Sequence, residues 1–204
     1  MNSLPSLLRL LLIGLMVFSG ALASAQEWPT KSVRIVVPFT PGGSTDSIAR
    51  LLATKMEART KHTFTVENIS GGGSIIGAAN VANSAPDGAS LLFTGGGTIN
   101  VMKHTSTSLP IDAEAVLTPI TFVNTLPHWI VVRADRPERT FQDFIARIKK
   151  NPGKVSISVN AAGGAAHLGL AKWAVVNGLD IIIVPYRGSS AAMVDLFGGT
   201  TTAH

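Results

Sequence analysis

The sequence contains no cysteine among its 204 residues. Disulfide bonds, thiolate metal sites and cysteine nucleophiles are therefore excluded. Charged residues are also scarce, at 14%, whereas hydrophobic residues make up 46%, and this balance excludes an intrinsically disordered chain. The 20 glycines show no G-X-Y period, which excludes a collagen-like fibre. A chain of this length forms one large domain or two small ones.

Residues 1–25 have the layout of a secretory signal peptide. Arg9 precedes an apolar run from Leu10 to Phe18, and Ala23-Ser24-Ala25 forms a small-residue cleavage site. The alternative is an uncleaved anchor, but the run is short for a span of about 20 residues. No later stretch has 18 apolar residues in a row. We therefore expect cleavage before Gln26 and a soluble mature protein, and the lack of cysteine fits a bacterial periplasm.

The formal charge of +5 comes from scattered basic residues, and the chain has a single tyrosine. The one basic cluster, Arg147, Lys149, Lys150 and Lys154, lies at the end of an expected helix, where cations suit the helix dipole. Because aromatic and basic residues do not alternate, we expect no nucleic-acid partner. A mild positive field that attracts small anions is the favoured interpretation.

Short Val/Ile-rich runs predict strands buried on both faces, as in a parallel sheet. They lie at residues 33–37, 63–67, 91–94, 129–132, 155–159 and 181–184. Between them, apolar residues at Ile48, Leu51, Leu52 and Met56 form a helical stripe. Further helices are expected at 75–82, 165–176 and 191–197.

The helix that follows Thr140 has a capping-box variant, because Asp143 stands three residues later. Its predicted buried face consists of Phe141, Phe144, Ile145 and Ile148, and Asn151-Pro152-Gly153 ends it. This alternation of strands and helices predicts an α/β fold with right-handed crossovers. Residues 118–127, which contain two prolines, are where we expect the chain to pass from one lobe (26–124) to a second (125–204).

Five loops rich in glycine, serine and threonine each follow a predicted strand and precede a predicted helix. They are residues 38–46, 69–74, 94–98, 160–164 and 186–190. In an open α/β sheet such loops lie at the carboxyl ends of the strands, where ligands bind. Glycine allows close backbone approach, and helix N-termini present unpaired N–H groups and a partial positive charge. Several such loops facing one cleft predict a site for a small carboxylate, although any one of them alone is an ordinary turn.

Three side chains near these loops have two interpretations each. Asp46 stabilises a helix N-terminus, or it orients waters or a ligand amine. Arg187 pairs with a ligand carboxylate, or it is a surface charge. His167 is a packing histidine, the favoured interpretation, or it donates to a ligand. The other histidines do not cluster.

Familiar enzyme motifs are missing from the sequence. It contains no P-loop, no G-x-S-x-G elbow and no H-E-x-x-H, and residues 71–77 are one residue too long for G-x-G-x-x-G. Paired carboxylates are absent from the glycine loops, so acid–base catalysis has few candidates. We expect no enzyme activity, no metal and no cofactor. The rival hypothesis is a secreted enzyme that holds phosphate in a glycine loop, with Asp46 or His167 as its base.

The loops, in this order after a leader, resemble the periplasmic substrate-binding proteins of tripartite tricarboxylate transporters, the Bug-type family. The resemblance is carried by WPTKSVRIVVPFTPGGSTDSIARLLA (28–53), VENISGGGSIIGAANVANSAPDG (66–88), LPIDAEAVLTPITFV (109–123), NPGKVSISVNAAGGAAHL (151–168) and VPYRGSSAAMVDLFGG (184–199). It implies a two-lobed fold of the type II periplasmic-binding-protein kind, with a mostly parallel sheet in each lobe.

The resemblance also implies a function. Such proteins close on a small carboxylate, such as a di- or tricarboxylate, and hand it to membrane permease subunits; we expect a periplasmic monomer. The implied ligand-binding residues are Thr40, Pro41, Gly42, Gly43, Ser44, Thr45, Asp46, Gly72, Gly73, Ser74, Gly96, Gly97, Thr98, Ala162, Gly163, Gly164, His167, Arg187, Gly188 and Ser189.

The sequence departs from the family pattern at several points. Ala89 replaces the usual aromatic after PDG, and the loop at 160–164 has fewer hydroxyl donors than usual. Members continue for about a hundred residues more, and the tail Thr200–His204 does not resemble them. The sequence therefore predicts a C-terminally truncated chain whose second lobe is partial, with apolar surface left uncovered. A non-functional remnant is the third hypothesis.

Overall fold

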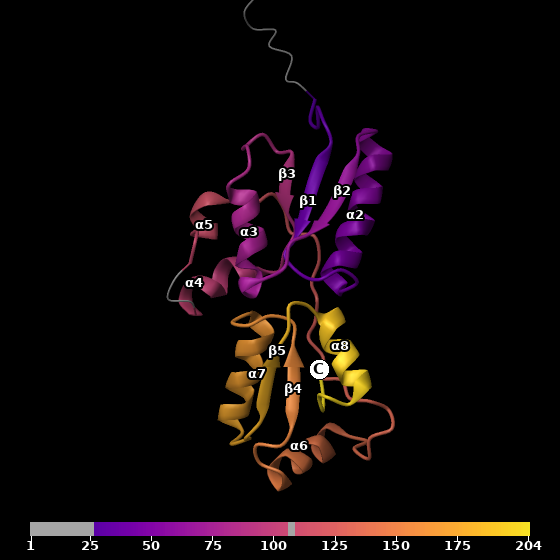
Figure 1. Cartoon of the computed structure of the whole chain (residues 1–204), viewed down its shortest axis with the longest axis vertical. Helices are drawn as coiled ribbons and strands as arrows, with labels where there is room; N and C mark the ends of the chain where they lie inside the picture. The colour runs from indigo at the N-terminus through magenta and orange to yellow at the C-terminus, as the bar shows by residue number, and fades with distance from the viewer. Residues whose placement is uncertain (1–26, 106–108) are drawn as a thin grey trace, which may run out of the picture. The chain divides into compact units, whose positions relative to one another are not determined.

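The computed structural model describes residues 27–105 and 109–204, without the side chains of Thr98 and Met102. The chain divides into two compact units, Met1–Thr30 and Lys31–His204. The expected signal peptide at 1–25 lies outside the described residues. Residues 27–30, the described part of the first unit, form no helix or strand. Everything that follows concerns the second unit, whose elements are labelled in Figure 1.

The first sheet contains three parallel strands in the order β2-β1-β3. They are β1 (Val33–Val37), β2 (Phe64–Asn68) and β3 (Ser90–Leu92), paired in register Val33 with Phe64 and Arg34 with Ser90. The central strand β1 has four buried residues out of five, as its continuous apolar run predicts for a strand covered on both faces. The edge strand β2 alternates between inner and outer residues.

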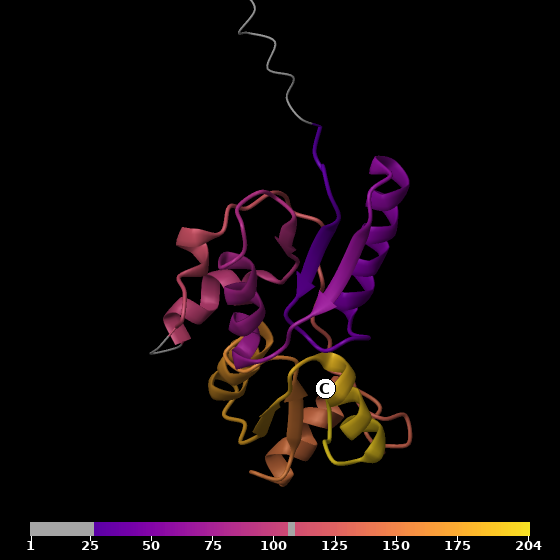
Figure 2. The same cartoon turned by 45° about the horizontal axis from the view of Figure 1, so that its top comes forward.

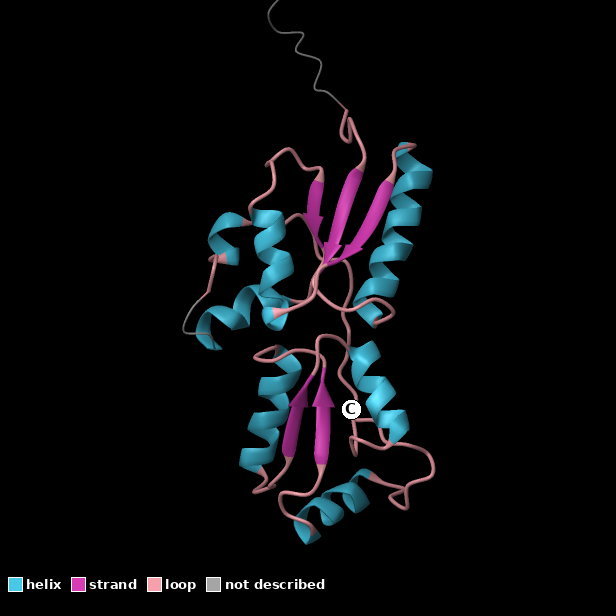
Figure 3. Ribbon diagram, in the orientation of Figure 1, coloured by secondary structure: helices cyan, strands magenta, loops and turns pink. Residues whose placement is uncertain are grey.

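Two helices cover this sheet (Figure 3). Helix α2 (Ser44–Thr60) packs on β1 and β2, whereas α3 (Ile75–Ala82) packs on β1 and β3. Val33, Ile35 and Val37 lie in one core cluster with Ala49 and Ala53 of α2. Because side chains alternate along a strand, Val36 faces the opposite side, where Ile75 and Ala78 of α3 contact Leu92.

The apolar stripe predicted in α2 is not the buried face of the helix. The helix forms as expected, but its buried residues are Asp46, Ala49 and Ala53, whereas Leu51 is 59% exposed. Alanine has no bulk beyond Cβ, so this face lets the helix axis approach the sheet closely. Met56 is the one member of the predicted stripe that packs on the same cluster.

The 3-10 turn η1 (Gly72–Ser74) lies between β2 and α3. Three short elements follow β3: the π-helical turn η2 (Gly97–Val101), α4 (Met102–Thr105) and α5 (Ala113–Val116). Asp112 caps α5 by accepting from the backbone N–H groups of Glu114 and Ala115. Residues 117–131 then run without helix or strand, in the region where we expect the passage between lobes; the boundary at 124/125 stays a prediction.

The second sheet pairs β4 (Ser156–Val159) in parallel with β5 (Ile182–Pro185). Helix α7 (Ala165–Val176) lies against β5 and α8 (Ser189–Gly198) against β4, one on each side of the sheet in two views (Figures 1 and 2). The core joins these elements to α6 (Phe141–Lys150) through Ile148, Ile157 and Leu170. The predicted α/β class, with parallel sheets, is confirmed.

Helix α6 begins with the predicted capping box. Thr140 Oγ1 accepts from the Asp143 backbone N–H, and the Asp143 carboxylate accepts from the Thr140 N–H. Phe144 and Ile148 are buried as predicted, but Phe141 is 48% exposed and contacts the Trp173 ring with centroids 5.8 Å apart. The helix ends at Lys150, as the Asn-Pro-Gly sequence predicts.

The strand predicted at 129–132 is wrong. Val132 forms a single bridge to Ala203, and Trp129 is 76% exposed. A regular strand needs a partner along its length, and here the partner is the short stretch at 203–204, since Val131 and His204 exchange backbone hydrogen bonds of 2.8 and 3.0 Å. Ala203 also bridges Ile157, so this tail extends the second sheet beside β4.

Several large apolar side chains are exposed. Val175, Phe122, Trp129 and Ile120 are each at least 75% exposed. Within the described residues, no helix combines the length and apolar character needed to cross a membrane.

Candidate functional site

All five glycine-rich loops occupy the position that the sequence predicts. Each follows the carboxyl end of its strand, at the arrowhead in Figure 3, and leads into a helix or helical turn. Four of them, those after β1, β2, β4 and β5, line one cavity of about 310 Å³. Its walls are formed by Pro38, Phe39, Gly71, Gly72, Gly73, Ser74, Asn160, Ala161, Ala162, Pro185, Tyr186 and Arg187.

Five of the predicted site residues lie on these walls: Gly72, Gly73, Ser74, Ala162 and Arg187. The others do not line the cavity, and their contact with a ligand stays a prediction. Thr40 and Gly188 stand beside wall residues, where the first and fifth loops contact each other. Those set back from the walls are Pro41, Gly42, Gly43, Ser44, Thr45, Asp46, Gly163, Gly164, His167 and Ser189.

The third loop does not line the cavity, so Gly96 and Gly97 are not wall residues. The Thr98 side chain lies outside what the structure describes. Gly97 instead packs against the start of α7, because a Cβ at this position would lie 3.0 Å from the Ala165 nitrogen. This loop supports the fourth loop from outside.

The second loop forms a wall made mainly of backbone. Gly71, Gly72, Gly73 and Ser74 have φ angles of 134°, 55°, 65° and 92°. Positive φ angles are readily adopted by glycine, which occupies three of these four positions. A Cβ at Gly71 would lie 2.8 Å from Ile76 Cδ1. Successive turn residues of this kind make concave backbone surfaces that suit anions, and this one leads directly into α3.

Helices that begin at the glycine-rich loops differ from α5 and α6 in how their N-termini are capped. No side chain caps the N-terminus of α2, α3, α7 or α8, although Ser74 is itself the N-cap residue of α3. Helices α5 and α6, which follow no strand, are both capped by side chains. An uncapped helix start leaves N–H groups available and carries a partial positive charge. At α3, however, the Ser74 and Ile75 N–H groups bond to the Gly71 and Gly72 carbonyls.

Asp46 is buried and holds the first loop in shape. The Asp46 side chain is 4% exposed. Its Oδ2 accepts from the Gly42 N–H at 2.9 Å and from Arg50 Nε at 3.0 Å, and its Oδ1 accepts from Asn68 Nδ2 at 2.9 Å. Burial acts to raise the pKa of Asp46, but the hydrogen bonds from Arg50, Gly42 and Asn68 outweigh it and hold the pKa below its usual value. The structural interpretation of this residue is therefore favoured over ligand contact.

His167 has a similar supporting position. Its Nδ1 accepts a hydrogen bond of 2.9 Å from the Gly163 backbone N–H, so in the neutral ring the proton is on Nε2. The imidazole fixes the fourth loop from one helical turn further along. This contact favours a structural histidine.

Charge on the cavity wall comes from one side chain. Arg187 is exposed, and within the described residues no ion pair or hydrogen bond involves its guanidinium. Tyr186, the other ionisable wall residue, donates its phenolic proton to Asp195 Oδ2. That hydrogen bond, with burial and the Asp195 charge, raises the pKa of Tyr186 to about 12. The wall is therefore cationic at neutral pH.

This tyrosine can be titrated directly, because it is the only one in the chain. We expect its absorbance near 295 nm to change with a midpoint near pH 12 and, in Asp195→Asn, to shift towards the ordinary value of 10.0. A raised pKa means that the stability from this contact is complete below pH 10 and is lost as the pH rises through 12. Circular dichroism at each pH reports whether the protein is still folded; a midpoint near 10 in the folded wild type contradicts the assignment.

The list of implied ligand-binding residues omits several wall residues: Phe39, Asn160 and Tyr186, which lie inside the predicted loops, and Pro185, which precedes one of them. Each of these residues lies within two residues of the end of a strand. Their position after a predicted strand, rather than their residue type, could therefore have identified them. Loop composition pointed to glycines further along. Among the described residues, no three His, Cys, Asp or Glu side chains gather as a metal site.

Comparison with known proteins identifies the relatives of this chain. Residues 48–203 match the family model described as the tripartite tricarboxylate transporter family receptor. The chain is 34% identical over 198 residues to Protein BugT of Bordetella pertussis, covering 95% of this chain and 61% of BugT. The match reaches residue 203, so the expectation that Thr200–Ala203 fall outside the family pattern is wrong.

Solved structures agree with this match. A structure described as a periplasmic transporter superposes with a TM-score of 0.80 at 37% identity, over 86% of this chain and 59% of its own. Rpa4515 of R. palustris, solved with adipate, superposes with a TM-score of 0.83 at 29% identity, over 87% and 59%.

The chain spans about 60% of the length of these relatives. The family is one of substrate-binding receptors rather than enzymes. The family match covers most of the chain, and the two superposed structures are of a periplasmic transporter and of a relative solved with a carboxylate. The chain belongs to the tripartite tricarboxylate transporter receptor family.

Proposed function

We propose that this chain captures a small organic carboxylate in the cavity formed by its glycine-rich loops, for delivery to the membrane permease subunits of a tripartite transporter. The observation that carries the proposal is the wall itself, which is bordered by helix starts without side-chain caps and by Arg187. Among the residues that the structure describes, Arg187 has no ion-pair partner and no carboxylate side chain lines the cavity. An anion there gains favourable interactions and meets no like charge. The cavity of about 310 Å³ is at the small end of ligand pockets, roughly 300–1,000 Å³.

The proposed site comprises the wall residues together with the predicted residues behind them. The wall supplies backbone N–H groups from the second, fourth and fifth loops, and Arg187 supplies a guanidinium. Asp46 and His167 hold the loops that bear these groups. The relative Rpa4515 was solved with adipate, which makes a linear dicarboxylate the first ligand to test.

The remaining parts of the proposal rest on the sequence. We propose export to the periplasm through the leader at 1–25, lobes at 26–124 and 125–204, and a monomer without nucleic-acid contacts. The leader pattern supports export. The resemblance to the family and the proline-containing segment at 118–127 support the two lobes.

Isothermal titration calorimetry with adipate and with its uncharged diamide, adipamide, tests the proposal. We expect adipate to bind and adipamide not to, because the amide lacks the negative charge that the wall attracts. Citrate, malate and acidic amino acids extend the screen. Equal binding of adipate and adipamide, or no heat with any carboxylate, contradicts the proposed function.

The variant Arg187→Gln tests the role of the wall charge in adipate binding directly. The variant removes the one wall charge, and we expect adipate affinity to fall about 10-fold, the lower end of the effect of a charged hydrogen bond because Arg187 is exposed. Arg59→Gln is the matched control: Arg59 is an exposed cation in the last turn of α2, and its loss should leave the affinity unchanged. The same loss of affinity in both variants indicates a general field effect and contradicts the role of Arg187.

A further inference from the structure

The first and fifth loops are tied together by two hydrogen bonds. The Thr40 backbone N–H donates to the Arg187 carbonyl at 3.0 Å, and the hydroxyls of Thr40 and Ser190 lie 2.8 Å apart. Thr40 follows β1 and Ser190 lies in the first turn of α8. These bonds therefore join loops that 150 residues separate along the chain.

Gly188 makes this approach possible. It is buried, and its φ of 152° with ψ of 161° lies in a region that essentially only glycine adopts. A Cβ here would lie 2.2 Å from Thr40 Oγ1 and 3.0 Å from the Thr40 nitrogen. Since the clash involves backbone as well as side chain, no other residue at 188 is compatible with the contact.

The contact borders the cavity. Phe39 and Arg187, the chain neighbours of Thr40 and Gly188, are both wall residues. A ligand that leaves between the first and fifth loops needs these loops to separate. The Thr40 N–H holds the Arg187 carbonyl, so this contact also helps to fix the position of the Arg187 side chain. The contact therefore links retention of a ligand to the position of the wall charge.

We propose that Thr40, Gly188 and Ser190 form a rim latch, in which Thr40 is a positioning residue that holds the fifth loop and Arg187 against the first loop. The latch acts in the ligand-free protein and slows ligand release. Its effect on release rests on the proposed function, whereas its effect on the ligand-free loop does not.

Hydroxyl deletions test the latch. Thr40→Val and Ser190→Ala each remove the hydroxyl–hydroxyl bond with little change in shape, and Thr40→Ser retains it. Because one bond is lost in either case, the double variant should behave like each single variant. Thr54→Val is the control, since Thr54 is exposed on α2 and its Oγ1 donates to the Arg50 carbonyl at 3.1 Å.

Trypsin cleavage at the Arg187–Gly188 bond reports the ligand-free state. We expect cleavage, located by mass spectrometry, to be about 3- to 10-fold faster in Thr40→Val and Ser190→Ala, the range expected for loss of one hydrogen bond. Thr40→Ser and Thr54→Val should match the wild type. Gly188→Ala should open the rim further, whereas Gly178→Ala, at another positive-φ glycine with no neighbour within 4 Å, should not; circular dichroism confirms that each variant is folded.

Stopped-flow release of adipate provides the second measurement. We expect release to be about 3- to 10-fold faster in the two hydroxyl variants, with rescue in Thr40→Ser. Unchanged cleavage in both variants overturns the latch, and so does faster cleavage with unchanged release. If the wild type binds no carboxylate, the proposed function fails, and cleavage alone decides on the latch.

Discussion

Replacing Gly77 by alanine is expected to destabilise the protein by about 2–3 kcal/mol, as overpacking of a filled site does. Gly77 is buried in α3, where a Cβ would lie 2.7 Å from both the Ile69 carbonyl oxygen and Pro38 Cβ. Alanine normally stabilises a helix relative to glycine by about 1 kcal/mol, so the expected effect has the opposite sign to the local propensity. The close approach of α3 to the ends of β1 and β2 is what reverses it.

Urea unfolding followed by circular dichroism measures this effect, and Gly169→Ala is its matched control. Gly169 is exposed in the middle of α7, with nothing within 4 Å of an added Cβ. There we expect a gain of about 0.5–1 kcal/mol. Because Pro38 also lines the cavity, Gly77→Ala should weaken adipate binding as well. Equal stabilisation by both substitutions contradicts the packing of α3 described above.

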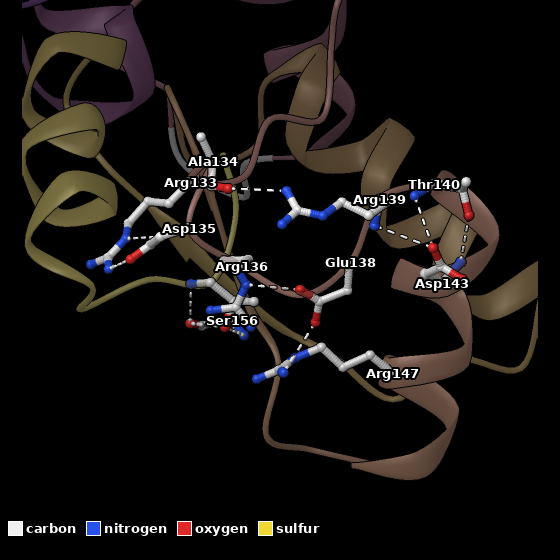
Figure 4. A network of polar contacts seen from close by, with 11 residues as sticks. Arg133, Ala134, Asp135, Arg136, Glu138, Arg139, Thr140, Asp143, Arg147 and Ser156 are labelled. Atoms are coloured by element: carbon white, nitrogen blue, oxygen red, sulfur yellow. Dashed lines mark hydrogen bonds and ion pairs between the residues drawn. The ribbon is translucent and has the colours of Figure 1, made fainter.

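Glu138→Gln is expected to have a similarly large effect on stability. The Glu138 side chain is 6% exposed and lies between two arginines, with Oε1 3.0 Å from Arg147 Nη1 and Oε2 3.3 Å from Arg136 Nε (Figure 4). The second contact is an ion pair whose direction does not make a hydrogen bond. Removing the charge of Glu138 leaves both guanidinium groups without their shared counter-charge. We expect this to cost about 2–4 kcal/mol, a little less than for a fully buried pair because Arg147 is partly exposed.

The stability that Glu138 contributes should depend on pH. Burial acts to raise the pKa of Glu138, but its backbone hydrogen bond and the two arginines outweigh it and hold the pKa below the ordinary value of 4.5. The stability that Glu138 contributes is therefore complete above pH 4.5 and is lost as the pH falls through the lowered value. The difference in unfolding free energy between wild type and Glu138→Gln should shrink over that acidic range.

Asp135→Asn is the control for Glu138. Asp135 pairs with Arg133 in the same network, but its side chain is 60% exposed, so its loss should change stability little. A Glu138→Gln variant as stable as Asp135→Asn, or a stability difference that does not depend on pH, contradicts the assigned role of the buried carboxylate.

Local sequence signals predicted most elements of the fold correctly. The Thr140–Asp143 capping box, the Asn-Pro-Gly stop after Lys150 and the bounds of α3 and α7 all depend on residues within one or two helical turns. The failures are of another kind. The apolar run at 129–132 lacks a partner strand over most of its length, and the buried face of α2 follows small alanines rather than the leucine stripe. Both depend on contacts distant in the chain.

The same division applies to the candidate site. Glycine, serine and threonine after each strand determined which loops carry backbone N–H groups at helix starts, because those preferences are local. Only the tertiary structure decided that four of the five loops share a cavity, that Asp46 supports a loop from behind, and that Phe39 and Tyr186 reach the wall. The reason is that a wall is formed by long-range packing between segments such as Thr40 and Ser190, whose distance in space no local pattern encodes.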